Sequence, residues 1–415
     1  MDREIKKKVF YGALAGLGIA AYCYYAFYKI IFVYSGISGY DFRLGYTAAG
    51  NYLAGRSIYT MPADLSAFFY FPAVVVLYLP FSWLPVTAAK SLWFALGHLL
   101  MLYAAYGIYS FGRKKGRLLS LAAVAIAYVS TPLYQTFFIG NINILIFFGL
   151  YLVYAEILSG RTRFSSYLIA GFSAIKVMPA LLMGFFLRER AYPAFVRFFG
   201  FLLFLALLSL SVFGLRENLN YFVHLRGLNS MVGPLQAMSL TYFLKLFWPE
   251  ASASALLLPN IVLALVLGLL WWRAPGRAAV PGPGSRAADL FALSVAVTLL
   301  LPSSWLTYSG LFLVPFYFVL HSLLEERKDF KAIPVFLAVF VFLNFWEIIA
   351  HHLPLGPGRP TLDLVWHNRN SYPALFPLLF SLQFVAALLL FVWVIVNYKA
   401  LAANMERIAG AGRPV

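Results

Sequence analysis

Charged residues are scarce in this chain of 415 residues. Asp, Glu, Lys and Arg make up 11% of it, whereas 62% of the residues are hydrophobic. An ordinary soluble domain is about 25% charged, so this chain has too few charges to cover a water-facing surface of its size. The composition therefore excludes a soluble enzyme, a disordered protein or a nucleic-acid-binding domain as the main interpretation. It favours a polytopic membrane protein, and the 18% of aromatic residues fits that class.

Cysteine is also nearly missing, since Cys23 is the only one in the sequence. A single cysteine excludes an intramolecular disulfide. No His/Cys spacing suggests a structural zinc site. We therefore expect neither a metal centre nor any other resident cofactor.

Negative charge is in short supply, which leaves a formal net charge of +17. Such an excess can indicate a nucleic-acid partner. In membrane proteins, however, Lys and Arg collect in cytoplasmic loops. Most of the Lys and Arg residues fall into loops that alternate correctly with the apolar segments, so we expect membrane lipids around the protein and no nucleic-acid partner.

Apolar segments long enough to cross a membrane recur along the chain. A spanning helix needs about 20 largely apolar residues. The pattern predicts an all-α polytopic protein of about 10–12 transmembrane helices. The firm crossings are 9–34, 86–110, 118–138, 142–158, 195–214, 253–272, 288–302, 308–324, 332–350 and 372–397.

The same pattern predicts one integral membrane domain, residues 1–415, with both termini cytoplasmic. Its first helix, residues 1–34, is expected to be retained rather than cleaved as a signal. Residues 35–85 form the first extracytoplasmic loop with juxtamembrane segments. Residues 86–397 hold the remaining helices, and 398–415 form a basic cytoplasmic tail.

Two apolar blocks do not behave as simple crossings. Block 68–84 is short and rich in proline, and we expect it to dip into the outer interface and return. Block 166–187 has basic residues at both ends and Lys176 in its middle. We predict a hairpin of two short helices with Lys176 near its tip, at the outer boundary; a single plain span is the alternative.

Two ionisable residues stand out as candidates for chemistry. Lys176 lies within an apolar block, where ionisable groups are usually functional, although a lysine can also snorkel to an interface. Asp41 follows the first span, where a carboxylate can act as a general base on a hydroxyl. The alternative for Asp41 is an N-cap of a helix over 42–54.

A series of short motifs begins at Asp41 and is spread over roughly residues 40–310. The motifs are Tyr40-Asp41-Phe42, Tyr46, Ala48-Ala49, Leu53, Gly55, Ile58-Tyr59, Tyr70-Phe71-Pro72, Leu79-Pro80-Phe81, Leu84-Pro85, Leu92-Trp93, Gly140-Asn141-Ile142-Asn143, Ala170-Gly171, Ile175-Lys176, Pro179, Asn229-Ser230 and Ser304-Trp305. In this order they resemble the motifs of glycosyltransferase family 87, a family of membrane transferases with the GT-C fold that includes polyprenol-phosphate-mannose-dependent α-mannosyltransferases.

The resemblance implies an inverting transferase that moves a hexose, with mannose as the first choice. The donor would be a polyprenyl-phosphate sugar, used on the outer face, and the acceptor a lipid or an envelope glycan. It implies that Asp41 is the general base and that Lys176 binds the donor phosphate. The weaker candidates for substrate contacts are Arg43, Asn141, Arg226, Trp305, Tyr308 and Arg369. Arg43 is expected either to orient Asp41 or to be a surface charge.

This sequence departs from the family pattern at two places. Thr307, followed by Tyr308, stands where the family often has a histidine, and Asn141 stands where a glutamine is frequent. Two other functions remain open. One is a transporter or flippase for lipid-linked sugars, and the other is a ligase or polymerase of envelope polymers.

Overall fold

The described part of the chain folds into helices and contains no strand. The computed structural model describes residues 3–33, 38–65, 68–176, 178–231, 239–248, 251–274, 282–300, 310–352 and 375–410. Its contacts divide the chain into two compact units, 1–128 with 133–231 and 408–415, and 129–132 with 232–407. The all-α prediction is confirmed; the prediction of one membrane domain stays a prediction.

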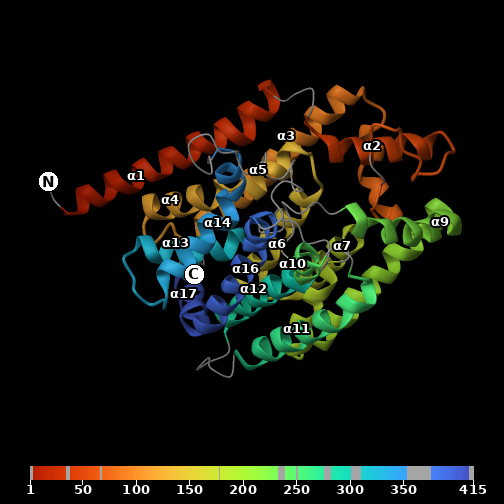
Figure 1. Ribbon diagram of the computed structural model, residues 1–415. Helices are drawn as coiled ribbons and strands as arrows, with labels where there is room; N and C mark the ends of the chain where they lie inside the picture. The colour runs from red at the N-terminus through yellow and green to blue at the C-terminus, as the bar shows by residue number, and fades with distance from the viewer. Residues whose placement is uncertain are drawn as a thin grey trace. The chain divides into compact units, whose positions relative to one another are not determined.

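The first unit carries the helices around the candidate site (Figure 1). They are α1 (Arg3–Tyr22), η1 (Cys23–Val33), α2 (Tyr40–Leu53), η2 (Pro72–Leu77), η3 (Leu79–Phe81), α3 (Val86–Gly112), α4 (Arg117–Tyr128), α5 (Thr131–Phe138), α6 (Asn143–Leu158), α7 (Arg163–Ile175), η4 (Met178–Met183), α8 (Gly184–Arg188) and α9 (Tyr192–Met231). Helix α1 packs along α4, and α7 packs between α6 and α9.

The second unit is a separate helical cluster. It contains α10 (Leu240–Phe247), α11 (Ala253–Arg273), α12 (Pro283–Leu300), α13 (Leu313–Leu324), α14 (Ile333–His352), α16 (Leu375–Val396) and, as far as Arg407, α17 (Tyr398–Gly410). Helix α16 packs on α12 and α14. The Tyr398 hydroxyl donates to Asp289 Oδ1 at 2.8 Å, and Ser322 Oγ donates to Asn404 Oδ1 at 3.0 Å. These buried bonds fasten α17 to α12 and α13, so residues 398–410 of the expected tail are an ordered helix.

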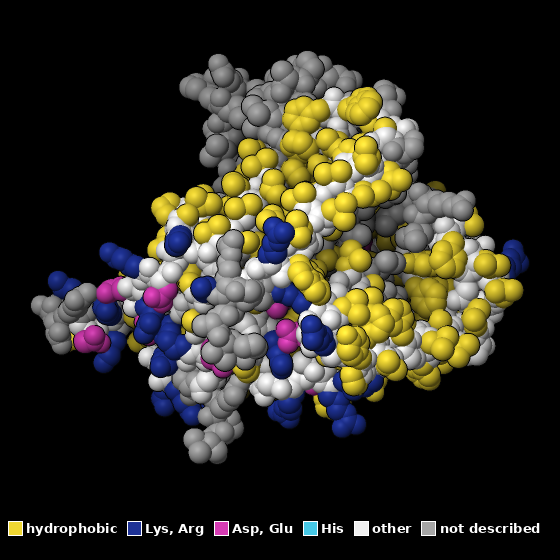
Figure 2. Space-filling view, turned by 90° about the horizontal axis from the view of Figure 1, so that it is seen from below, with side chains coloured by type: hydrophobic (Ala, Val, Ile, Leu, Met, Phe, Trp, Pro, Cys, Tyr) yellow, Lys and Arg dark blue, Asp and Glu magenta, His cyan; other side chains and the backbone are white. Residues whose placement is uncertain are grey.

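Several helices are long and apolar enough to cross a membrane. Within the described residues four single helices qualify, and counting two sharply bent pairs brings the number to six. Figure 2 shows continuous areas of exposed hydrophobic side chains, as expected of surfaces that face lipid. The chain is therefore a multi-pass membrane protein; the count of ten to twelve crossings stays a prediction.

The apolar blocks 68–84 and 166–187 are interrupted where prolines or a lysine occur. Residues 72–81 form the short 3-10 helices η2 and η3, which are too short to span. Helix α7 ends at Ile175, and Lys176 has an extended backbone before η4 and α8. Block 166–187 is therefore not one continuous helix, and the hairpin with Lys176 at the outer boundary stays a prediction.

Helix α9 extends beyond the predicted crossing 195–214. The chain stays helical to Met231. Gly214 has a non-helical backbone, with φ 73° and ψ 171°, so α9 consists of two helical segments that meet there at a kink. Glycine adopts this positive φ without the steric cost that a side chain would add. The helical segment after the kink lies against the first loop, as described below.

Candidate functional site

The start of α2 is held against the turn between α5 and α6. Gly39 N–H donates to the carbonyl oxygen of Phe138, and Asp41 N–H donates to that of Ile139, both at 2.7 Å. The first amides of a helix have no partner within it, so these bonds satisfy two of them. They bring Asp41 next to residues 140–143, about a hundred positions further along the chain.

Gly140 makes this close approach possible. Its φ is 67°, and a Cβ atom there would lie 2.9 Å from Phe42 Cβ and 3.2 Å from Gly39 Cα. Any other residue would strain the backbone and push the two segments apart. Trp93 Nε1 donates to the Gly140 carbonyl at 3.1 Å, which ties the turn to α3.

The Asp41 carboxylate accepts a hydrogen bond from the Asn141 amide nitrogen. The other end of that amide, Asn141 Oδ1, accepts from Asn143 N–H at 2.8 Å, which fixes its orientation. Asp41 lies in the first turn of α2, where the helix dipole favours negative charge. The N-cap residue is Gly39, with no side-chain cap, so the alternative role of Asp41 as an N-cap is wrong.

An aromatic cluster lies beneath the start of α2. Phe42, Tyr78 and Trp93 are at most 4% exposed, and the Tyr78 and Trp93 rings stack with centroids 5.2 Å apart. Such surroundings solvate a charge poorly, so burial raises the pKa of the half-buried Asp41 carboxyl to about 6. Lys176 and the hydrogen bond from Asn141 act in the opposite direction and lower that pKa.

Lys176 joins this site from the end of α7. Its side chain is half-buried, with Nζ 5.7 Å from the centre of the Tyr70 ring. Its charge interacts with Asp41 strongly enough to lower the pKa of that carboxyl. The structure thus gathers Asp41, Asn141 and Lys176 from three separate helices or turns.

The other predicted site residues are not gathered in the same way. Arg43 Nη2 donates to Asp64 Oδ2 at 2.8 Å, and both side chains are exposed. The structure therefore pairs Arg43 with Asp64, and the expectation that Arg43 orients Asp41 is not met. Arg226 is on α9, but its side chain is not among those described. Trp305, Tyr308 and Arg369, with Thr307, lie outside the described residues.

Glu217, on the second half of α9, anchors the first loop. Its Oε2 accepts from Ser57 Oγ at 2.8 Å and from Ile58 N–H at 3.2 Å. His224, two turns further on, stacks on Tyr59 with ring centroids 4.6 Å apart. No local sequence pattern marks Glu217, because its partner Ser57 is 160 positions away.

Asn143 is a second residue to which no role was assigned. It is 1% exposed, and neither end of its side-chain amide has a hydrogen-bond partner among the described residues. A buried unpaired amide is costly, and such groups often await a ligand or water. Its place in the Gly140–Asn143 motif was the signal that pointed to it.

The site thus combines a carboxylate of raised pKa, an amide that holds it and a cation from a neighbouring helix. This arrangement, in a multi-pass helical protein, is suited to group transfer at a membrane. The profile of Glycosyltransferase family 87 matches residues 68–307, more than half of the chain. The chain belongs to glycosyltransferase family 87. The matched range includes Asn141 and Lys176 and begins after Asp41. No curated protein and no solved structure matches the chain.

Proposed function

We propose that this protein is an inverting membrane glycosyltransferase that moves a hexose, with mannose as the first choice, from a polyprenyl-phosphate donor. The acceptor is a lipid or an envelope glycan, and transfer takes place on the extracytoplasmic face. The observation that carries the proposal is the carboxylate of Asp41, held by Asn141 and coupled to Lys176.

Asp41 is the general base of the proposed reaction. The acceptor oxygen attacks the anomeric carbon, its proton passes to Asp41, and the bond from the anomeric carbon to the phosphate oxygen breaks. The electron pair of that bond leaves with the polyprenyl phosphate, so attack from the opposite face inverts the configuration. A base with a pKa of about 6 is mostly ionised at pH 7 and still close to the pH at which it works.

Lys176 supplies the positive charge that the leaving phosphate requires. Negative charge grows on the phosphate in the transition state, and a fixed cation stabilises it most at that step. Lys176 also keeps Asp41 ionised by lowering its pKa. Because the donor lipid carries the activated sugar, we propose that no resident cofactor takes part.

Substitution of Asp41 by Asn tests the proposal directly. Asparagine keeps the shape and can still accept the bond from Asn141, but it cannot take up a proton. Loss of a positioned base typically costs about 10²–10⁴-fold in rate. The assay incubates membranes containing the full chain with radiolabelled polyprenyl-phosphate mannose and measures labelled lipid and glycan products.

Asp64→Asn is the matched control, because it removes the same charge from the same loop. Asp64 is exposed and paired with Arg43, so its loss should change transfer little. Near-normal transfer by Asp41→Asn, with loss in Asp64→Asn, would make Asp64 the base. Transfer unchanged in both variants would exclude a carboxylate base in this loop.

A further inference from the structure

A cavity lies between α6, α7, α9 and η2, wholly within the first unit. Its volume is about 1250 Å³, above the roughly 300–1,000 Å³ of pockets for drug-sized ligands. Most of its wall is apolar. The main apolar residues are Leu145, Leu152, Leu168, Phe172, Phe201 and Leu205.

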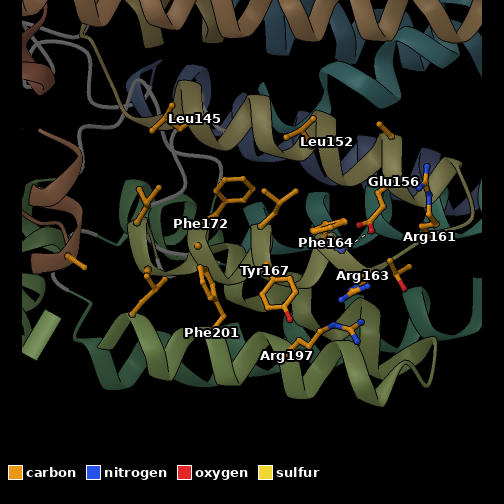
Figure 3. A pocket seen from close by; sticks show the side chains of 18 of the residues that line it. Leu145, Leu152, Glu156, Arg161, Arg163, Phe164, Tyr167, Phe172, Arg197 and Phe201 are labelled. Atoms are coloured by element: carbon orange, nitrogen blue, oxygen red, sulfur yellow. Dashed lines mark hydrogen bonds between the residues drawn. The ribbon is translucent and has the colours of Figure 1, made fainter. Parts of the chain in front are cut away.

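One end of this cavity is basic. Arg161, Arg163 and Arg197 line it, and Figure 3 shows these side chains together at one end, with Leu145, Phe172 and Phe201 toward the other. Arg161 and Arg163 are exposed. Arg197 is half-buried, and its Nε lies 3.4 Å from Ser166 Oγ.

Glu156 is the one carboxylate among the described residues that line the cavity, and it is already engaged. It accepts from Phe164 N–H at 2.7 Å and from Ser165 N–H at 2.5 Å, which satisfies the first amides of α7. Among the residues that the structure describes, no carboxylate forms an ion pair with the three arginines. The end of the cavity therefore has an excess of positive charge.

This basic end is distinct from the site around Asp41. Arg163 begins α7, and Lys176 follows its last residue. Thirteen residues of helix separate them by about 20 Å at about 1.5 Å per residue. A phosphate bound at Lys176 therefore cannot also be bound at Arg163.

We infer that the cavity binds an anionic phospholipid of the surrounding membrane. Its phosphate lies at Arg161, Arg163 and Arg197, and its acyl chains lie along the apolar wall. Arginine suits this headgroup because its planar donors match phosphate oxygens, and basic pockets between membrane helices bind such headgroups. Both halves of the ligand are needed, since a free phosphate would leave the apolar wall uncovered.

The test is native mass spectrometry of the delipidated full-length protein with dioleoyl-phosphatidylglycerol or dioleoyl-phosphatidylcholine, which share the same chains. The anionic lipid should be retained preferentially. Each arginine contributes about fivefold in affinity, so the triple variant R161Q/R163Q/R197Q should lose on the order of 100-fold. Leu152→Trp fills part of the apolar wall and should weaken binding without changing any charge.

The matched control is R113Q/K115Q/R117Q, which removes three exposed charges at the turn between α3 and α4, none of which lines the cavity. It should bind phosphatidylglycerol as the unchanged protein does, and thermal stability of every variant is measured alongside. Equal retention of the two lipids, or equal loss in the two triple variants, would overturn the inference. Undecaprenyl phosphate that displaces phosphatidylglycerol and depends on the same arginines would also overturn it.

Discussion

Substitution of Asn141 by Ala is expected to move the pH dependence of transfer. The amide of Asn141 donates to the Asp41 carboxylate and so stabilises its ionised form. Without that bond the pKa of Asp41 rises. A base must be ionised before it can accept a proton, so the rising limb of the pH profile should shift toward higher pH.

The size of the shift follows from the kind of bond that is lost. A hydrogen bond to a charged group contributes about 1.5–3 kcal/mol, and one pKa unit corresponds to about 1.4 kcal/mol. The pKa of Asp41 should therefore rise by about one to two units from its value of about 6. At pH 7 the ionised fraction falls from about nine-tenths to between about a half and a tenth.

The measurement is kcat/KM for sugar transfer from pH 5 to 9, since this ratio reports the pKa of the free enzyme. Asn141→Ala should lose about two- to tenfold at pH 7 and recover at pH 9. Asp41→Asn should stay inactive throughout. Asn143→Ala is the control, because the side chain of Asn143 does not bond to Asp41. The rising limb of the pH profile of this variant should stay where it is. An unshifted limb in Asn141→Ala, with equal loss at every pH, would refute this account of Asp41.

Three further expectations concern the cation, the membrane orientation and metal ions. Lys176→Met should weaken use of the donor strongly. It should also shift the rising limb of the pH profile toward higher pH, because Lys176 lowers the pKa of Asp41. A rising limb that stays in place would show that Lys176 does not act on Asp41. With Cys23 replaced by Ser, a cysteine at the exposed Thr60 should react with an impermeant reagent from outside, and one at the exposed Lys115 should not; the reverse pattern would place the Asp41 site on the cytoplasmic face. Removal of divalent ions by a chelator should leave transfer unchanged, and activity restored by an added metal would contradict the expected absence of a cofactor.

Hydropathy was sufficient to predict the class of fold. In lipid every backbone polar group must find a partner within the protein, so long apolar segments can only be helices here. The break at Lys176 was also predictable, because a charge and a proline interrupt an apolar block. The continuation of the helix past Gly214 was not predictable, because the segment 215–231 mixes charged and apolar residues and packs against a distant loop.

Within the candidate site, the sequence by itself determined that Asp41 and Lys176 were unusual, because each places a charge at or within apolar surroundings. Only the tertiary structure decided which residues act on them. Arg43, two positions from Asp41 in the sequence, forms an ion pair with Asp64. Asn141, a hundred positions from Asp41, donates a hydrogen bond to it. Residues 41 and 43 point in different directions on a helix, and the turn at Gly140 approaches α2 only because a glycine with positive φ leaves room for Phe42. Such contacts depend on how distant helices pack, which no local pattern encodes.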